Sequence, residues 1–294
     1  DGDSPRGPGQ AAEEKGRGIP DPDSGVGDRA PVVGADGGSA ADFPAAITLG
    51  GTEMALVPAG EFLMGSPFGE GRRDRDSNLE NESPQHRAFL EAFYIDRFEV
   101  SNRSFLEFVR ETRRPQPSPP NFDPDYFRTK PDYPVLGQDW ESARDFCRWK
   151  GQRLPDEAEW EKAARGAEGR PYPWGEAFEE GFANLLGPDD YPGPAPCGAF
   201  PRDRSPFGVM DMAGNVSEWV ADDYRLYPGN PAAVPAEQRR HKVIKGGFFG
   251  VNRLREELAR ATYRLAMKPE EQLPAIGFRC AADAKAALGP RSRE

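Results

Sequence analysis

The sequence contains few of the residues that most often carry catalysis, and no segment long enough to cross a bilayer. Its 294 residues include only three cysteines and two histidines. No run of about 18 apolar residues occurs, so no transmembrane helix is expected. Acidic residues outnumber basic ones, 49 to 38, which gives a net charge of −11. Without a basic stripe that carries aromatic residues, nucleic acid is not an expected partner.

The scarce cysteines and histidines also limit the chemistry. Three cysteines, Cys147, Cys197 and Cys280, allow at most one disulfide within the chain, and three buried thiols are the alternative. The two histidines, His86 and His241, belong to no nucleophile–histidine–acid motif, and the sequence holds no phosphate-binding glycine loop. We therefore predict no catalytic residue from these motifs.

The chain does hold many turn-forming residues, 33 glycines and 31 prolines, which favour short elements and long loops. Residues 1–45 are rich in Gly, Pro, Asp, Ala and Ser and predict a disordered leader or tether. Residues 46–284 predict one domain, and residues 285–294 a polar tail. The chain begins with Asp1 rather than Met, so we expect a processed or truncated product, with which a lipid anchor is compatible.

Three helices are predicted by apolar spacing and capping residues. They cover about residues 101–112, the segment after Asp139, and the segment from Asp156, where Glu159 completes a capping box. Strands are expected at residues 61–65 and 89–100. Beyond Gly166 the sequence is irregular and rich in loops, with short apolar pieces at residues 219–221, 243–244 and 276–280. This pattern indicates an α+β domain of low regular content.

Several segments together resemble one family. They are 54–66 (MALVPAGEFLMGS), 153–166 (RLPDEAEWEKAARG), 208–219 (GVMDMAGNVSEW) and 276–280 (IGFRC). In this order, over about residues 50–284, they are similar to the formylglycine-generating enzyme, or sulfatase-modifying factor, family. The resemblance implies its C-type-lectin-like α+β fold, with loops on a small twisted sheet.

The resemblance also implies two structural calcium sites. The first would use the side chains of Asn184 and Asp189 and the carbonyls of Leu185 and Tyr191. The second would use the side chains of Asp211 and Glu218 and the carbonyls of Gly214 and Val216. Calcium accepts six to eight hard oxygen ligands in relaxed geometry, which this set can supply. Taken without the resemblance, Asp and Asn in loops indicate turns rather than metal ligands.

A disulfide between Cys147 and Cys280 is likewise implied by the family. Such a bond predicts an oxidising compartment, that is, the periplasm, the cell surface or the exterior. Cys197 has no counterpart in the family pattern and is expected to be a buried or half-buried thiol.

The resemblance breaks down after Gly247. Enzymes of the family hold copper with two cysteine thiolates in this segment, a role for soft ligands. The matching positions here fall near Val251 and Glu256, and no cysteine occurs between Cys197 and Cys280. We therefore expect no copper and no formylglycine-generating oxidase activity.

Two functions remain open. The first is a non-catalytic, calcium-stabilised binding or scaffold module whose former substrate cleft takes a peptide, glycan or protein partner. The second is an enzyme of the same family that acts on a protein or peptide without thiol chemistry. The candidate cleft residues are Phe248, Phe249, Asn252, Glu256, Arg260 and Arg264. The simplest alternative for residues 254–264 is a solvated amphipathic helix in place of the catalytic loop.

Overall fold

The computed structural model describes residues 43–70, 80–185, 191–250 and 255–289. All of them belong to one compact unit, Gly37–Glu294. Most of the expected leader and tail lie outside the described residues, as do the site candidates Asp189 and Asn252. Within the described ranges, no helix has both the length and the apolar character that a membrane crossing requires.

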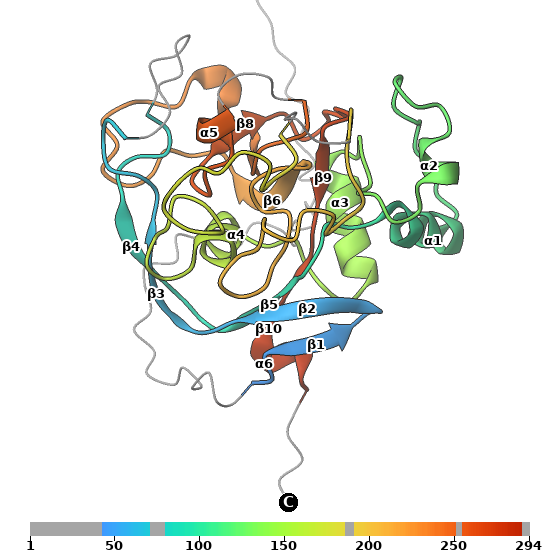
Figure 1. The fold of residues 1–294 in the computed structure, drawn as a ribbon, viewed down its shortest axis with the longest axis horizontal. Coiled ribbons are helices and arrows are strands. Elements are labelled where there is room, and N and C mark those ends of the chain that lie inside the picture. The colour runs from blue at the N-terminus through green and yellow to red at the C-terminus, as the bar shows by residue number, and fades with distance from the viewer. Residues whose placement is uncertain (1–42, 71–79, 186–190, 251–254, 290–294) are drawn as a thin grey trace, which may run out of the picture. The chain divides into compact units, whose positions relative to one another are not determined.

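A first antiparallel sheet joins the two ends of the domain. Its strands are β1 (Ala46–Leu49), β2 (Thr52–Val57), β5 (Phe93–Asp96) and β10 (Ala281–Asp283), in the order β1-β2-β5-β10. Figure 1 shows this sheet at the base of the molecule. Strands β3 (Gly60–Met64) and β4 (His86–Leu90) form a separate antiparallel pair. Because β10 pairs with β5 in register Ala281–Ile95, the last strand closes the fold onto the first third of the chain.

A second sheet has the order β8-β7-β6-β9. Its strands are β6 (Ser217–Asp223), β7 (Lys242–Lys245), β8 (Arg264–Met267) and β9 (Ile276–Phe278). β6 and β9 run parallel, whereas the other two pairs are antiparallel. The short apolar pieces at residues 219–221, 243–244 and 276–280 therefore belong to strands of one sheet in the half of the chain that was expected to be mostly loops.

The three predicted helices are confirmed as α1 (Asn102–Thr112), α3 (Trp140–Trp149) and α4 (Glu157–Arg165). Their caps are those that the sequence indicates: Ser101, Asp139 and Asp156 each accept a backbone hydrogen bond in the first turn, and Glu159 completes the capping box. The remaining helical segments are single turns: α2 (Tyr126–Thr129), the 3₁₀ turn η2 (Ala236–Gln238), α5 (Arg255–Leu258) and α6 (Ala284–Ala287).

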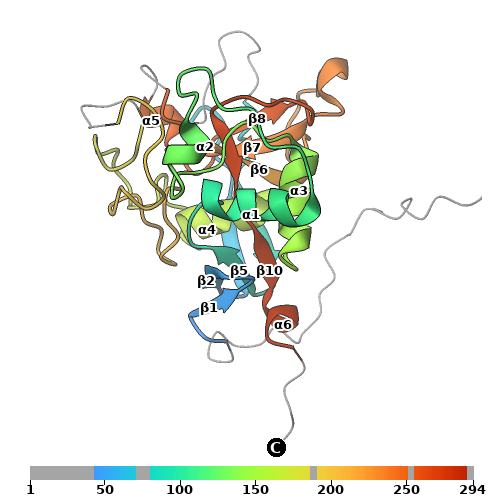
Figure 2. The ribbon, with the colours of Figure 1, turned by 90° about the vertical axis from the view of Figure 1, so that its right-hand side faces the viewer.

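The main core lies where α4 meets both sheets (Figure 1). Trp160, Ala163 and Ala164 of α4 pack in one cluster with Ile95 of the first sheet and Val220 of the second. A second core holds α1 and α3 against β9 (Figure 2) through stacked and edge-on phenylalanine rings. The apolar faces of three short helices therefore hold together a domain with little regular structure.

Two expectations about individual elements were wrong. Residues 89–100 do not form one strand, because β4 ends at Leu90 and β5 spans only Phe93–Asp96. The solvated helix expected over residues 254–264 is limited to α5, and the chain then turns into the interior. Ala259, Ala261 and Thr262 are completely buried there. The small and hydroxyl side chains at these positions allow the segment to pack in the interior. The spacing of apolar residues, which indicated a surface helix, did not predict this burial.

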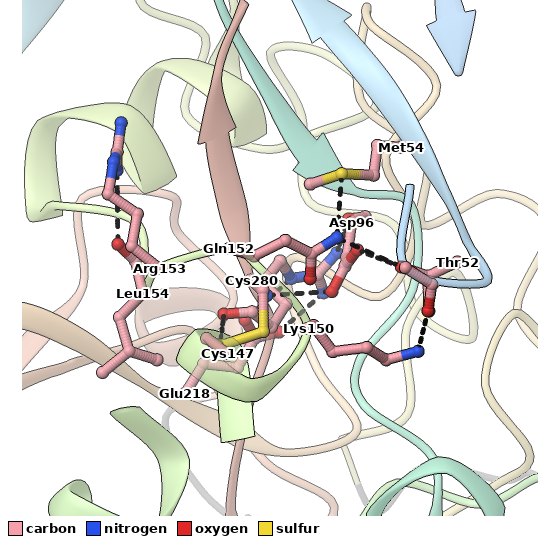
Figure 3. Close-up of a disulfide and its surroundings, with 12 residues drawn as sticks. Thr52, Met54, Asp96, Cys147, Lys150, Gln152, Arg153, Leu154, Glu218 and Cys280 are labelled. Carbon is pink, nitrogen blue, oxygen red and sulfur yellow. Dashed lines mark hydrogen bonds and ion pairs between the residues drawn. A yellow bond between two sulfur atoms is a disulfide. The ribbon is translucent and has the colours of Figure 1, made fainter. Parts of the chain in front are cut away.

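The expected disulfide between Cys147 of α3 and Cys280 is present (Figure 3). It joins positions 133 residues apart, with 5.6 Å between the Cα atoms. Both cysteines are fully buried in the second core. The bond restricts the unfolded chain over this loop, which contributes about 4–5 kcal/mol in the chain-entropy model.

Reduction of this bond should therefore lower stability. We expect the Cys147→Ala/Cys280→Ala variant to lose about 2–5 kcal/mol of unfolding free energy in urea titrations. Cys197→Ala serves as the control, because Cys197 is outside the disulfide. Equal unfolding free energies of the double variant and the wild type would contradict a stabilising role.

Asp222, a half-buried residue of β6 that accepts a hydrogen bond from the start of α4, predicts a pH dependence. Asp222 accepts a hydrogen bond of 2.6 Å from the Glu157 backbone N–H. Burial, and then the nearby Glu157 carboxylate, raise the pKa of Asp222 to about 6. Because the folded state resists ionisation of Asp222, its contribution to stability is greatest below pH 4 and falls as the pH rises through 6.

Asp222→Asn should remove this dependence while keeping an oxygen acceptor. Between pH 4.5 and 7.5 we expect its unfolding free energy to rise relative to the wild type by about 1–3 kcal/mol. Asp223→Asn makes the same charge change on an exposed neighbour that pairs with Lys242, and it should show no such trend. Parallel pH profiles for Asp222→Asn and wild type would refute the assignment.

Candidate functional site: a buried acidic cluster and an altered cleft

Two residues expected to hold the second calcium ion, Asp211 and Glu218, lie near the buried Arg279. Glu218 of β6 forms a two-point ion pair with Arg279, with contacts of 2.6 Å to Nη2 and 2.7 Å to Nε. The indole N–H of Trp160 donates to the same carboxylate at 2.9 Å. Glu218 and Arg279 are both completely buried. Both oxygens of Glu218 are thus engaged by donors of the protein itself.

Asp211 lies in a tight turn before β6. Its backbone has a positive φ of 59°, and Asn215 in the same turn has 66°. Asp203 stabilises this turn by accepting hydrogen bonds from the backbone N–H groups of Met212, Ala213 and Gly214. The turn therefore presents the Asp211 carboxylate to the interior, where its Oδ2 accepts from the Gly198 N–H at 2.6 Å.

A third carboxylate, Glu99, belongs to this cluster and was missed in the sequence. Its Oε1 accepts from Asn215 Nδ2 at 2.9 Å, whereas its buried Oε2 has no hydrogen-bond donor among the described residues. The carboxyl groups of Glu99 and Asp211 lie within hydrogen-bonding distance of each other. The thiol of Cys197 donates to the backbone carbonyl of Glu99 at 3.7 Å. A single glutamate outside any sequence motif gives no signal of a site, so its position beside Asp211 is visible only in the folded structure.

Burial raises the pKa values across the cluster. Desolvation raises the pKa of Asp211 to about 6 and that of Asp203 to about 8. The pKa of Glu99 is also raised, first by burial and then by the neighbouring Asp211. Burial likewise raises the pKa of the Cys197 thiol, which therefore lacks the low pKa of a reactive nucleophile.

The described part of the first expected calcium site adjoins this cluster. Asn184 is buried, and its Nδ2 donates to the Gly193 carbonyl and to Asn215 Oδ1. These two bonds fix the amide so that its buried Oδ1 faces no donor of the described residues. An amide oxygen left in this way suits a cation ligand. Asn215 thus contacts both regions, since it also binds Glu99.

A cavity of about 220 Å³ adjoins the acidic cluster at Glu99. It is lined by Glu99 and Cys197, by Phe98, and by further acidic and hydroxyl side chains including Asp96 and Ser101. Among the residues with described positions, no group of three or more His, Cys, Asp or Glu side chains is arranged to hold a metal ion. Any cation here would therefore need carbonyl or water oxygens in addition to the carboxylates.

The candidate cleft residues with described positions do not converge on one point. Phe249 contacts Phe248 and the half-exposed Phe122, with ring centroids 6.3 and 5.9 Å apart. Glu256 is exposed, and its carbonyl accepts from the Tyr172 hydroxyl. Arg260 instead binds Ser66, which belongs to the turn after β3, through Nη2 at 2.6 Å.

Arg264 lies in the interior and not in a cleft. It is 2% exposed and grips Glu157 with contacts of 2.6 and 2.8 Å. Beside it, Lys245 donates to Glu161 at 2.9 Å, and Glu161 also pairs with Arg165. This network connects β7, β8 and α4. Apart from Glu161 and Arg165, which are four residues apart on α4, its partners are too far apart in sequence to be recognised as pairs.

The alternation of small sheets and loops around a buried acidic cluster defines an α+β domain with the fold of the formylglycine-generating enzymes. Residues 39–284 match the family model described as sulfatase-modifying factor enzyme 1-like domain. The chain belongs to this family, and the resemblance and the fold class inferred from the sequence are confirmed.

Relatives of this chain include both active and inactive proteins. It is 30% identical to the inactive C-alpha-formylglycine-generating enzyme 2 of Bos taurus, over 79% of this chain and 88% of that protein. It is 29% identical to the formylglycine-generating enzyme of Bos taurus, over 79% and 75%. Among solved structures, PvdO from Pseudomonas aeruginosa matches with a TM-score of 0.62 and 28% identity, over 79% of this chain and 94% of that one.

The buried pair of Arg264 and Glu157 gives a direct test of the network. Arg264→Leu should lower the unfolding free energy by about 3–5 kcal/mol, because it removes the two-point partner of the buried Glu157 carboxylate. Arg87→Leu is the matched control, since Arg87 pairs with Glu61 on the exposed faces of β3 and β4, and it should change little. The measurement is urea unfolding, and equal losses in the two variants would contradict the role of Arg264.

Proposed function

We propose that this protein is a non-catalytic, calcium-stabilised binding or scaffold module that works outside the cytoplasm. The observation that carries this proposal is the lack of thiols where the family's oxidase holds copper. Two of the three cysteines form the disulfide, and the third, Cys197, lies beside Glu99 in the acidic cluster. No thiol pair is therefore left for a copper site.

The glycines that precede the altered segment have a packing role that does not depend on catalysis. A Cβ atom at Gly247 would lie 2.7 Å from the Ala213 carbonyl oxygen and 2.8 Å from Leu185 Cδ2. At Gly246, φ is +76° and a Cβ atom would approach the Trp160 ring to 3.2 Å. This pair thus lets β7 leave the sheet close to the proposed calcium loops. The glycine pair therefore supports the view that the scaffold is kept, and it gives no support for a kept reaction.

The calcium part of the proposal rests on the oxygen groups described above. Asn184 Oδ1 and Glu99 Oε2 are buried without donors among the described residues, and such groups are costly to leave unpaired. In the first site Asn184 would act with the Leu185 and Tyr191 carbonyls and with Asp189. A bound ion would order these loops. The Cys147–Cys280 disulfide supports the extracytoplasmic part.

The partner surface that we favour is formed by Phe122, Phe248 and Phe249. Phe122 is 51% exposed, and its ring meets Phe249 edge-on. Aromatic rings that remain at the surface in one group are typical anchors for a protein or peptide partner. This group lies next to the Gly246–Gly247 turn, where the family's cleft is expected.

Metal analysis with an oxidation assay tests the proposal. Protein purified without chelator should contain calcium but no stoichiometric copper, by inductively coupled plasma mass spectrometry. Incubated with Cu(I), oxygen and a cysteine-containing sulfatase peptide, it should produce no formylglycine by mass spectrometry, while an active family member does. Copper at one equivalent together with formylglycine formation would overturn the non-catalytic assignment.

A further inference from the structure

A second cavity, of about 430 Å³, lies between the proline-rich segment after α1 and the loop before β9. Phe105 and Val109 of α1, together with Leu136, give it an apolar floor. It shares no lining residue with the cavity at Glu99. Its volume is in the range of sites that enclose a small molecule.

The polar part of the lining is uncharged. Six amide or hydroxyl side chains line the cavity: Gln116, Ser118, Asn121, Gln138, Ser142 and Gln272. None of the described residues in the lining is acidic, although the chain contains 49 acidic residues. The charged member, Arg114, is paired with Asp145 at 2.5 Å. An ionic ligand would therefore find no free counter-charge in this cavity.

Two of the amides are held so that each leaves an oxygen for a ligand. Gln138 is 7% exposed, and its Nε2 donates to the Leu136 carbonyl at 2.9 Å. Gln272 Nε2 donates to Asp139 Oδ2 at 3.3 Å. Neither Oε1 accepts a hydrogen bond from a described residue. Because a shielded amide oxygen without a donor costs free energy, a ligand that brings O–H groups would be stabilised here.

Prolines fix the wall that carries Gln116, Ser118 and Asn121. All four prolines of this segment line the cavity: Pro115, Pro117, Pro119 and Pro120. A proline ring restricts its own φ angle, so the segment has little backbone freedom left to lose when a ligand binds. The neighbouring polar side chains are therefore presented at a low entropic cost, which favours affinity.

The density of hydrogen-bonding groups distinguishes a saccharide from a peptide. An extended peptide offers one N–H and one carbonyl per residue, that is, per about 3.4 Å of chain. A sugar ring carries a hydroxyl group on most of its carbons, and each hydroxyl both donates and accepts. Six neutral polar side chains around one small cavity match the sugar better. The C–H face of the ring can pack on the apolar floor and on the prolines.

We propose that this cavity binds a neutral saccharide, whose hydroxyl groups donate to the Oε1 atoms of Gln138 and Gln272. The inference goes beyond the proposed function, since it uses neither the calcium loops nor Phe248 and Phe249. The module then has a carbohydrate site in addition to its partner surface.

Ligand-observed NMR titrations of the full chain test this site. The probes are the neutral disaccharides lactose, maltose, cellobiose and diacetylchitobiose, with sialyllactose as an anionic probe. The wild type should bind at least one neutral probe, and it should bind sialyllactose no more tightly than lactose, because no free cation lines the cavity. Binding of no neutral probe, or a clear preference for the anionic one, would overturn the proposal.

Two variants of similar side-chain length locate the binding. Gln138→Met and Gln272→Met remove the amide oxygen, and each should weaken binding about tenfold, as expected for the loss of one hydrogen bond. Gln85→Met is the matched control, because Gln85 Nε2 also donates to a backbone carbonyl, at 3.4 Å, but this residue does not line the cavity. Its affinity should equal that of the wild type.

Thermal melting separates ligand loss from misfolding. Gln272 is exposed, so Gln272→Met should melt at the wild-type temperature and tests the site even where Gln138→Met lowers stability. Equal affinities of Gln272→Met and the wild type would overturn the assignment. An uncharged extended peptide that binds and displaces the disaccharide from the wild type but not from Gln272→Met would identify a peptide site, which also contradicts it.

Discussion

The ion pair between Glu218 and Arg279 is the interaction on which the arrangement of this domain depends. Glu218 belongs to β6 of the second sheet, and Arg279 follows β9 and precedes β10 of the first sheet. The guanidinium also binds carbonyls at the end of β5 and in the loop before β6, and Trp160 of α4 donates to the same carboxylate. One buried pair therefore connects both sheets and the central helix. Cys280, adjacent to Arg279, adds the covalent link to α3 (Figure 3). Because both charges are fully buried, the loss of either partner would leave an expensive unpaired charge.

This constraint also explains why the fold persists around an altered segment. The groups that hold the domain together are the disulfide, the Arg279 pair and the Arg264–Glu157 network, and none of them uses the positions near Val251 and Glu256. The family's catalytic thiols can thus be absent without loss of the scaffold. The function of this protein should therefore be sought at the surface near Phe249 and in the ions that stabilise the adjoining loops.

Much of the fold was predictable, because capped helices and the family's segments are local signals. Ser101, Asp139 and Asp156 each predict the start of a helix from the few residues that follow them. The buried ion pairs were not predictable, because Arg264 and Glu157 are 107 residues apart and Lys245 and Glu161 are 84. Arg264 was assigned to a cleft because it lies in the altered segment after Gly247. Glu99 was missed because only the folded chain brings it to Asp211.

The most direct test of the account is a crystal structure of the protein grown with calcium and examined by anomalous scattering. We predict calcium peaks in the loop that holds Asn184 and in the turn that holds Asp211, with the two-point contact between Glu218 and Arg279 intact. A structure without calcium at either place, or with Arg279 displaced from Glu218, would contradict it.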